Sequence, residues 1–233
     1  MSVDAGTPSI QTHIPPEILP FIKILEEARL LAQTGRRTVL GLVGAPGAGK
    51  TTLARALHRA LENQSVVLPM DGFHLSNVVL ESLGRRDRKG APDTFDSAGF
   101  VALLERVRRQ TPRSGTIYAP EFDRNLDESI GGVISIPDDI PLVIVEGNYL
   151  LHKSDGWYPI ANCLDRSWFI DPPEALRQER LIQRHERFGM PASQARAWAL
   201  GTDQRNAELV LTTRSRADRI ISAPTDLPAD VLV

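Results

Sequence analysis

Residues 38–52 of the chain read TVLGLVGAPGAGKTT, a short apolar run followed by a glycine-rich turn. The turn at 44–51 fits the pattern GxxxxGK[ST] in full, and residues 51–63 have the spacing of an amphipathic helix. A strand, a glycine-rich turn and a helix in this order direct backbone N–H groups and the positive end of the helix dipole toward one point. The stretch therefore predicts a binding site for a polyphosphate.

Positions within this turn have distinct predicted roles toward a nucleotide. Lys50 would reach the β- and γ-phosphates of ATP, and the Thr51 hydroxyl would be a ligand of Mg²⁺. The predicted ATP contacts come from Gly44, Ala45, Pro46, Gly47, Ala48, Gly49, Lys50, Thr51 and Thr52. A chance glycine turn is the alternative, and the full match between a strand and a helix disfavours it.

Short apolar runs alternate with helical stretches along the rest of the chain. The runs fall at 38–43, 66–70, 116–119, 142–145, 167–170 and 217–222. The helical stretches fall at 51–63, 97–110 and 173–188, and a helical pattern resumes over 192–211. Uniformly apolar strands that alternate with helices indicate an α/β fold with a mostly parallel sheet covered on both faces. With the turn at 44–51, this predicts a P-loop NTPase three-layer sandwich with a helical lid.

Composition narrows the class of protein. The chain has 233 residues, is 42% hydrophobic and has a formal net charge of -2, which suits one large core and gives no general attraction to nucleic acid or an anionic membrane. The single cysteine excludes an intrachain disulfide, and no uncharged apolar run approaches the roughly 20 residues of a membrane helix. We therefore expect a cytoplasmic protein with neither nucleic acid nor membrane as a partner. A homodimer is left open.

Domain organisation follows from the same patterns. Residues 1–16 contain three prolines and no apolar period, and they predict a flexible arm. Apolar residues at helical spacing over 17–34 predict a leading helix that ends at Gly35. We expect residues 17–233 to form a single domain.

Two acidic residues follow apolar runs. The run at 66–70 leads into Asp71, and the run at 142–145 leads into Glu146. At the carboxyl ends of parallel strands both would lie in the crevice beside the glycine-rich turn. Asp71 would accept the proton of an attacking hydroxyl or help to hold the metal, or it would only form an Asp-Gly turn. Glu146 fits the loose Walker B pattern of a carboxylate near Mg²⁺.

Four arginines lie three or four residues apart in the stretch 173–188, and this spacing places them along one helix face. They are Arg177, Arg180, Arg184 and Arg187. Such a face would close over ATP as a lid, about residues 184–192, and neutralise charge on the transferring phosphoryl group. A solvated face paired with nearby glutamates is the alternative. The five histidines show no metal-ligand spacing, and His74, near Asp71, is the one further candidate.

Several segments together carry a family resemblance. Residues 88–96, RKGAPDTFD, are similar to the KKGFPESYD segment of pantothenate kinases, and 213–217, TRSRA, are similar to their TR-x-RA ending. Over about 38–221 the chain resembles the uridine kinase, phosphoribulokinase and type I pantothenate kinase family. It looks closest to a bacterial branch of nucleoside/nucleotide or fructose-transport-system kinases. The resemblance implies that Asp71 is catalytic together with Lys50, that Glu146 is the acid near the metal, and that Arg184 is a lid arginine.

The resemblance also implies an acceptor site. The segment 118–124, YAPEFDR, sits where the family has a Pro-x-Tyr substrate loop. The implied substrate contacts are Asp71, Lys89, Tyr118, Phe122, Arg124 and Tyr149. Where pantothenate kinases carry Tyr-Ser-His, this chain has Phe122-Asp123-Arg124, which argues against pantothenate itself.

These features predict an ATP- and Mg²⁺-dependent kinase that phosphorylates a hydroxyl of a small metabolite, such as a sugar, a nucleoside or a pantothenate-like compound. One alternative is a P-loop regulatory NTPase; for GTP it would need an Asn-Lys-x-Asp guanine reader, and the segment 162–165, NCLD, lacks the lysine. Another is a nucleotide-gated binding protein that phosphorylates no small molecule. Asp71 and the loop at 118–124 favour transfer.

Overall fold

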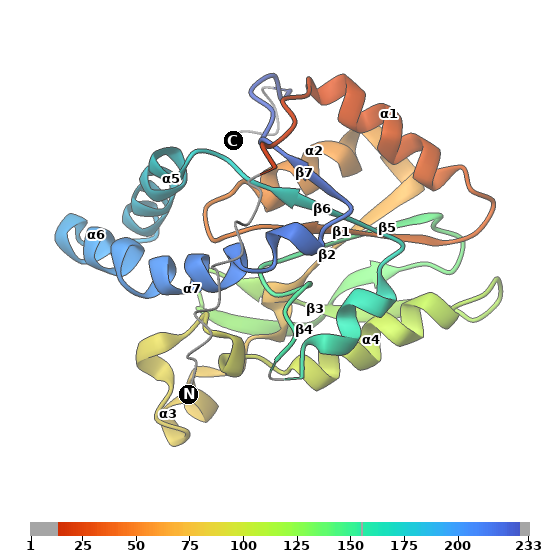
Figure 1. Ribbon diagram of the computed structural model, residues 1–233. Helices are drawn as coiled ribbons and strands as arrows, with labels where there is room; N and C mark the ends of the chain where they lie inside the picture. Colours follow the sequence, from red (N-terminus) through yellow and green to blue (C-terminus); the bar gives the residue numbers. More distant parts are fainter. Residues whose placement is uncertain (1–13, 155, 229–233) are drawn as a thin grey trace, which may run out of the picture.

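A parallel sheet forms the centre of the computed structural model, which describes residues 14–154 and 156–228. Within this part of the chain the sheet has five strands in the order β2-β5-β1-β6-β7 (Figure 1). The strands are β1 (Thr38–Val43), β2 (Ser65–Pro69), β5 (Leu142–Gly147), β6 (Arg166–Ile170) and β7 (Arg219–Ile221). Strand β1 pairs in parallel with β5 and β6, so the glycine-rich turn that follows it lies in the middle of the sheet edge.

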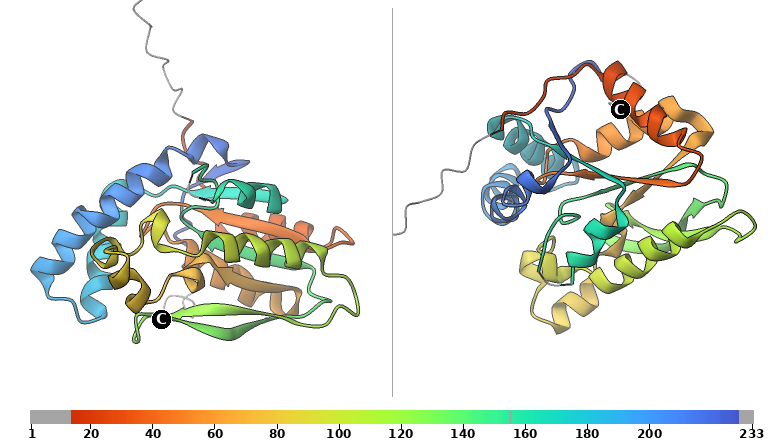
Figure 2. Two further views of the ribbon diagram at one scale, coloured as in Figure 1. Left: turned by 90° about the horizontal axis from the view of Figure 1, so that it is seen from below. Right: turned by 45° about the vertical axis from the view of Figure 1, so that its right-hand side comes forward.

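Helices cover both faces of the sheet (Figure 1). The α-helices are α1 (Phe21–Ala32), α2 (Lys50–Leu61), α3 (Asn77–Ser82), α4 (Ser97–Arg109), α5 (Glu174–Arg187), α6 (Ala192–Leu200) and α7 (Thr202–Leu211). Short 3₁₀ turns are η1 (Glu62–Gln64), η2 (Met70–Phe73), η3 (Arg86–Arg88), η4 (Pro92–Thr94), η5 (Tyr158–Cys163) and η6 (Arg214–Arg216). Helices α1 and α2 lie on one face, and α4 and η5 lie on the other (Figure 2). The predicted α/β architecture with a central parallel sheet is confirmed.

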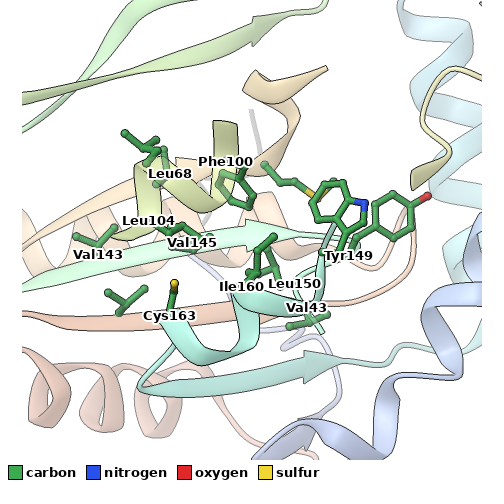
Figure 3. Close-up of a cluster of buried hydrophobic side chains, with 14 of the residues drawn as sticks. Val43, Leu68, Phe100, Leu104, Val143, Val145, Tyr149, Leu150, Ile160 and Cys163 are labelled. Carbon is green, nitrogen blue, oxygen red and sulfur yellow. The ribbon is translucent and has the colours of Figure 1, made fainter. Parts of the chain in front are cut away.

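The core has two layers because side chains alternate along each buried strand. Val143 and Val145 of β5 belong to the cluster on the α4 face, whereas Leu142 and Ile144 belong to the cluster on the face of α1 and α2. Figure 3 shows the first cluster, in which Phe100 of α4 lies over β5. Burial on both faces explains why the strand sequences are apolar at successive positions.

One predicted strand of the parallel sheet was wrong. The run at 116–119 belongs to β3 (Ile117–Asp123), which pairs antiparallel with β4 (Glu128–Ile136) in a separate two-stranded sheet. Ile117 and Ala119 are buried, but Tyr118 between them is 61% exposed. This alternation is typical of an antiparallel ribbon with one face in water, and the ribbon packs beside the sheet instead of within it. Strand β4 was not predicted.

The predicted leading helix is shorter than expected. Helix α1 begins at Phe21, after Pro20, and Glu17 instead forms a parallel bridge with Ile221 at the edge of β7. The bias of residues before a proline toward extended backbone explains the later start. Of the predicted arm, residues 1–13 lie outside the described residues, and the Ile14 carbonyl accepts a hydrogen bond from Arg214.

Beyond the carboxyl ends of the central strands, α5, α6 and α7 gather at one end of the molecule (Figure 1, Figure 2). Helix α5 follows β6, and the helical pattern at 192–211 is divided at Gly201 into α6 and α7. These helices occupy the region where the sequence predicts a lid. In the described part of the chain, no helix has the length and apolar character needed to cross a membrane.

Candidate active site

The glycine-rich turn at 44–51, hereafter the P-loop, connects β1 to α2 at the carboxyl edge of the sheet. Gly47 and Gly49 have φ angles of 80° and 97°, in the left-handed region that favours glycine. A Cβ on Gly47 would lie 2.6 Å from the carbonyl oxygen of Arg177, so α5 approaches the loop too closely for a side chain there. The glycines thus allow both the turn and the contact with α5.

The amino group of Lys50 is held by three oxygen atoms. Its Nζ lies 2.9 Å from the Gly44 carbonyl oxygen, 3.1 Å from that of Ala45 and 2.7 Å from Oδ1 of Asn148. Burial lowers the pKa of Lys50 to about 8, against the opposing effect of the Glu146 and Asp71 carboxylates. An anionic phosphate at the loop would favour the charged form of this buried group.

Thr51 and Glu146 form a pair of oxygen donors beside Lys50. The Thr51 hydroxyl donates a hydrogen bond of 2.8 Å to Oε1 of Glu146 at the end of β5. Glu146 is 5% exposed; burial and the charge of Asp71 raise its pKa. A hydroxyl and a carboxylate are the oxygen ligands that Mg²⁺ prefers, and that ion usually takes its other ligands from water and substrate phosphates. The pair therefore fits a magnesium ion.

Asp71 lies in η2, directly after β2. The β3–β4 ribbon packs against this turn: a Cβ on Gly72 would lie 2.2 Å from the Pro120 carbonyl oxygen. This packing brings Arg124, at the end of the ribbon, to Asp71, with 3.0 Å between Nη2 and Oδ2. Burial would raise the pKa of Asp71, but the charge of Arg124, assisted by those of Lys50 and Arg184, lowers it below its usual value. The carboxylate is therefore ionised.

The four arginines of α5 do not form one uniform face. Arg177 is 3% exposed and donates to the Pro46 carbonyl oxygen of the P-loop at 3.3 Å. Arg184 is half-buried; burial lowers its pKa, and the charges of Asp71 and Glu146 oppose that shift. A Cβ on Gly49 would lie 3.4 Å from Nη1 of Arg180, whereas Arg187 is exposed. Arg177 and Arg180 therefore approach the P-loop, and the charge of Arg184 interacts with Asp71 and Glu146. The alternative of a solvated face applies to Arg187.

Lys89 and Phe122 lie together beside Arg124, the partner of Asp71. Lys89 Nζ donates to Oδ1 of Asn77 at 2.8 Å and to the Asp127 carbonyl oxygen at 2.6 Å, and it lies 4.9 Å from the centre of the Phe122 ring. The predicted acceptor residues Asp71, Lys89, Phe122 and Arg124 are thus brought together. Lys89, Phe122 and Arg124 are hereafter called the acceptor wall, which contacts Asp71 through Arg124.

His74 contacts the acceptor wall through Phe122. Its ring stacks on Phe95 at 3.9 Å between centroids, and its Nδ1 is buried with no hydrogen-bond partner among the described residues. Burial lowers the pKa of His74 to about 4, with Lys89 acting in the same direction and Asp71 opposing it. The ring is therefore neutral near pH 7.

Two residues implied as acceptor contacts lie elsewhere. Tyr149, labelled in Figure 3, is completely buried. Its hydroxyl donates to the Gly90 carbonyl oxygen at 2.6 Å and so anchors the segment 88–96. Its burial leaves no atom facing an open site, so it supports the wall. Tyr118 is 61% exposed on the β3–β4 ribbon and lies six residues before Arg124, so the structure does not bring it together with that arginine.

The sequence reasoning missed Asn148 and the pairing of Asp71 with Arg124. Asn148 follows the acid at the end of β5, and its position two residues after Glu146 was the available indication, because polar residues at that edge face the P-loop. The ion pair had no sequence indication, since it depends on how the separate ribbon packs against η2.

Known proteins resemble the chain over most of its length. The family model described as "Phosphoribulokinase / Uridine kinase family" matches residues 39–188. The uncharacterized protein YggC of Escherichia coli is 36% identical over 191 residues, covering 80% of this chain and 78% of the relative. A Schizosaccharomyces pombe protein named "Putative uridine kinase C227.14" is 29% identical over 194 residues, covering 78% and 80%. A crystal structure from Silicibacter sp. TM1040, described as a "putative fructose transport system kinase", has a TM-score of 0.77 at 35% identity and covers 88% of this chain and 100% of its own.

Proposed function

The chain belongs to the phosphoribulokinase and uridine kinase family of P-loop kinases, and we propose that it transfers the γ-phosphoryl group of ATP to a hydroxyl of a small metabolite. One observation carries the proposal: the Asp71 carboxylate lies at the same sheet edge as Lys50 and the Thr51–Glu146 pair, and its charge acts on both Lys50 and Glu146. A site that only bound nucleotide would have no need of a base that also contacts the acceptor wall.

Each residue has a role in this transfer. The P-loop amides and Lys50 bind the phosphates, and the lysine charge follows the γ-phosphoryl group into the transition state. The acceptor hydroxyl gives its proton to Asp71 as its oxygen bonds to the γ-phosphorus; the bond from that phosphorus to the β–γ bridging oxygen breaks, and its electron pair leaves on ADP. Arg184 adds positive charge near the transferring group. Mg²⁺, held by Thr51 and Glu146, would neutralise charge on the phosphate oxygens.

The competing functions lack this support. A regulatory NTPase would activate water and would make no use of an acceptor wall. A nucleotide-gated binding protein would make no use of an ionised carboxylate at Asp71. The described structure supports transfer, because the conformation of η2 and the ribbon contact with Gly72 together hold Asp71 in contact with Arg124 of the acceptor wall.

The test is a product screen. The protein is incubated with ATP and Mg²⁺ and a panel of sugars, nucleosides, hydroxy acids and pantothenate, and the products are read by mass spectrometry together with ADP release. We expect one class of hydroxyl compound to be phosphorylated, and Lys50→Ala to abolish the product. ADP release that never depends on an acceptor and yields only inorganic phosphate would contradict the proposal and indicate an NTPase.

A further inference from the structure

Asp71, the proposed base, is paired with Arg124, whose guanidinium has further hydrogen-bond donors. Arg124 Nη2 donates to Oδ2 of Asp71 at 3.0 Å, and in the part of the chain that the structure describes this is the only hydrogen bond assigned to the Arg124 guanidinium. A guanidinium has five N–H donors, so most of its fork is available. The Arg124 side chain is 37% exposed and that of Asp71 is 30% exposed, so both can be reached from solvent.

The backbone that carries Arg124 is fixed, although its side chain is accessible. Oδ1 of Asp123 accepts the N–H groups of Asn125 at 2.8 Å and Leu126 at 3.1 Å, which forms the turn of the ribbon. Asp127 closes that turn onto the wall, since its carbonyl oxygen accepts the amino group of Lys89. Arg124 therefore projects from an ordered turn, as a recognition residue requires.

Cations from different elements act on Asp71. Lys50 is anchored on the P-loop, and Arg184 approaches from α5, so these two cations face the nucleotide. Arg124, whose charge also acts on Arg184, and Lys89 lie within 5.9 Å and 4.9 Å of the Phe122 ring centre. Lys89 is 7% exposed in its side chain and already bonded to Asp127 and Asn77, which leaves Arg124 as the accessible cation of the acceptor wall.

We propose, resting on the function proposed above, that the acceptor carries an anionic group, a carboxylate or a phosphate, which binds Arg124 and draws it away from Asp71. Arginine binds such oxyanions through two parallel N–H···O bonds, which the single contact with Asp71 does not use. A neutral acceptor has no group that would take the guanidinium, and it meets a carboxylate whose Oδ2 is already occupied. An anionic acceptor binds and releases the base in one step, so recognition and proton acceptance are coupled.

The experiment compares matched acceptors that differ in one anionic group. The pairs are a sugar and its sugar phosphate, a nucleoside and its monophosphate, and a polyol and the corresponding hydroxy acid, each with a free hydroxyl to accept the phosphoryl group. For wild-type protein we expect kcat/KM for an anionic member to exceed that of its neutral partner by about 10–100-fold, the range for a hydrogen-bonded charge pair. The first two pairs test phosphate, and the third tests carboxylate.

Variants separate recognition from a structural role. Arg124→Gln should lower kcat/KM for the anionic member by about 10–100-fold and leave the neutral member unchanged or improved, because Asp71 is then unpaired. Arg124→Lys keeps the charge without the fork and should recover part of the loss. Arg113→Gln removes an exposed arginine between α4 and β3 and should change neither member. Thermal unfolding and ATP affinity of Arg124→Gln should match the wild type.

Three outcomes would overturn the inference. If the neutral and anionic members of each pair have equal kcat/KM, the acceptor anion is not required, although the protein remains a kinase. If Arg124→Gln lowers both members of a pair equally, Arg124 is a structural partner of Asp71. If no member of any pair is phosphorylated while ATP is hydrolysed, both this inference and the proposed function fail.

Discussion

Oδ1 of Asn148 lies 2.7 Å from the amino group of Lys50, so the end of β5 supplies the acid Glu146 and the residue just after β5 supplies the side chain that positions the P-loop lysine. The two strands are in register: Leu42 of β1 lies opposite Glu146, and Val43 lies opposite Gly147. Strands β1 and β5 therefore end side by side at the active site. The position of the lysine depends on a residue 98 positions further along the chain.

Removal of this partner should weaken use of ATP. In Asn148→Ala the buried ammonium loses one of its three acceptors, and hydrogen bonds to charged groups contribute about 1.5–3 kcal/mol. We expect kcat/KM for ATP to fall by roughly 10–100-fold. Steady-state kinetics check the value, with Asn162→Ala, an exposed asparagine on η5, as the control. Unchanged kinetics in Asn148→Ala would show that the contact with Lys50 does not contribute to the use of ATP.

Asp71→Asn preserves the size of the side chain and removes the base. Transfer should fall by about 10²–10⁴-fold, the usual contribution of a positioned general base. ATP affinity should change little, because Lys50, Thr51 and the loop amides carry the phosphates. Single-turnover transfer, nucleotide binding and a Mg²⁺ titration on this variant measure the three effects. A shift of the Mg²⁺ requirement together with the rate would make Asp71 a metal ligand, and wild-type turnover would leave it as a turn residue.

Arg184 and Arg187 give a matched pair on α5. Arg184→Ala should lower kcat more than it lowers ATP affinity, since a group that closes over the phosphates acts mainly in the transition state. Arg187→Ala removes the same charge from an exposed position one turn away and should leave kcat near the wild-type value. Comparison of kcat with the dissociation constant for ATP in both variants tests this. Equal effects in the two would assign Arg184 to the general surface charge.

The neutral state of His74 predicts a contribution to acid sensitivity. Its pKa is about 4 in the folded protein and 6.5 in a model peptide. Between these values the unfolded chain binds more protons, so this group lowers the free energy of unfolding as pH falls from 6.5 to 4, by up to about 1.4 kcal/mol per pH unit. Above pH 6.5 it contributes no slope.

The variant His74→Phe should remove this part of the pH dependence, because a phenylalanine can stack on Phe95 without a titrating nitrogen. The difference in free energy of unfolding between variant and wild type should be constant above about pH 7 and grow in favour of the variant below 6.5. Urea unfolding at a series of pH values measures it. Parallel curves from pH 7.5 to 4.5 would mean that the buried ring is not held neutral.

Much of the central fold could be predicted because its determinants are local. The helices at 51–63, 97–110 and 173–188 appear as Lys50–Leu61, Ser97–Arg109 and Glu174–Arg187, within two residues at each end. Strands buried on both faces need continuous apolar residues, so the runs at 38–43, 66–70, 142–145 and 167–170 were visible without knowledge of their neighbours. Gly47 and Gly49 have positive φ angles, a conformation that favours glycine, so the glycine pattern in the sequence already indicated this turn.

The acceptor wall depends on long-range packing, which sequence spacing does not encode. The exposed stretch Ile130 to Val133 on β4 contains two glycines and has no buried face that would reveal a strand. Without β4, the run at 116–119 had no partner except the central sheet. The approach of Arg124 to Asp71 follows from the placement of this ribbon. The burial of Tyr149 follows from its contacts with the segment 88–96 and with Trp157. The resemblance therefore suggested these residues but not their neighbours.

The bridge between Glu17 and Ile221 has a consequence for the order of folding. Arg219 also pairs with Glu17, a contact that spans 202 positions of the chain. Closing a segment of that length costs conformational entropy before its own contacts are gained, whereas β1, β5 and β6 assemble around contacts with much larger apolar burial. We expect β7 and Glu17 to join the sheet last, after its central strands have formed. In hydrogen exchange of the native protein, the amides of Glu17 and Ser222 would then open at lower free energy than those of β1, which makes this edge the place where unfolding begins.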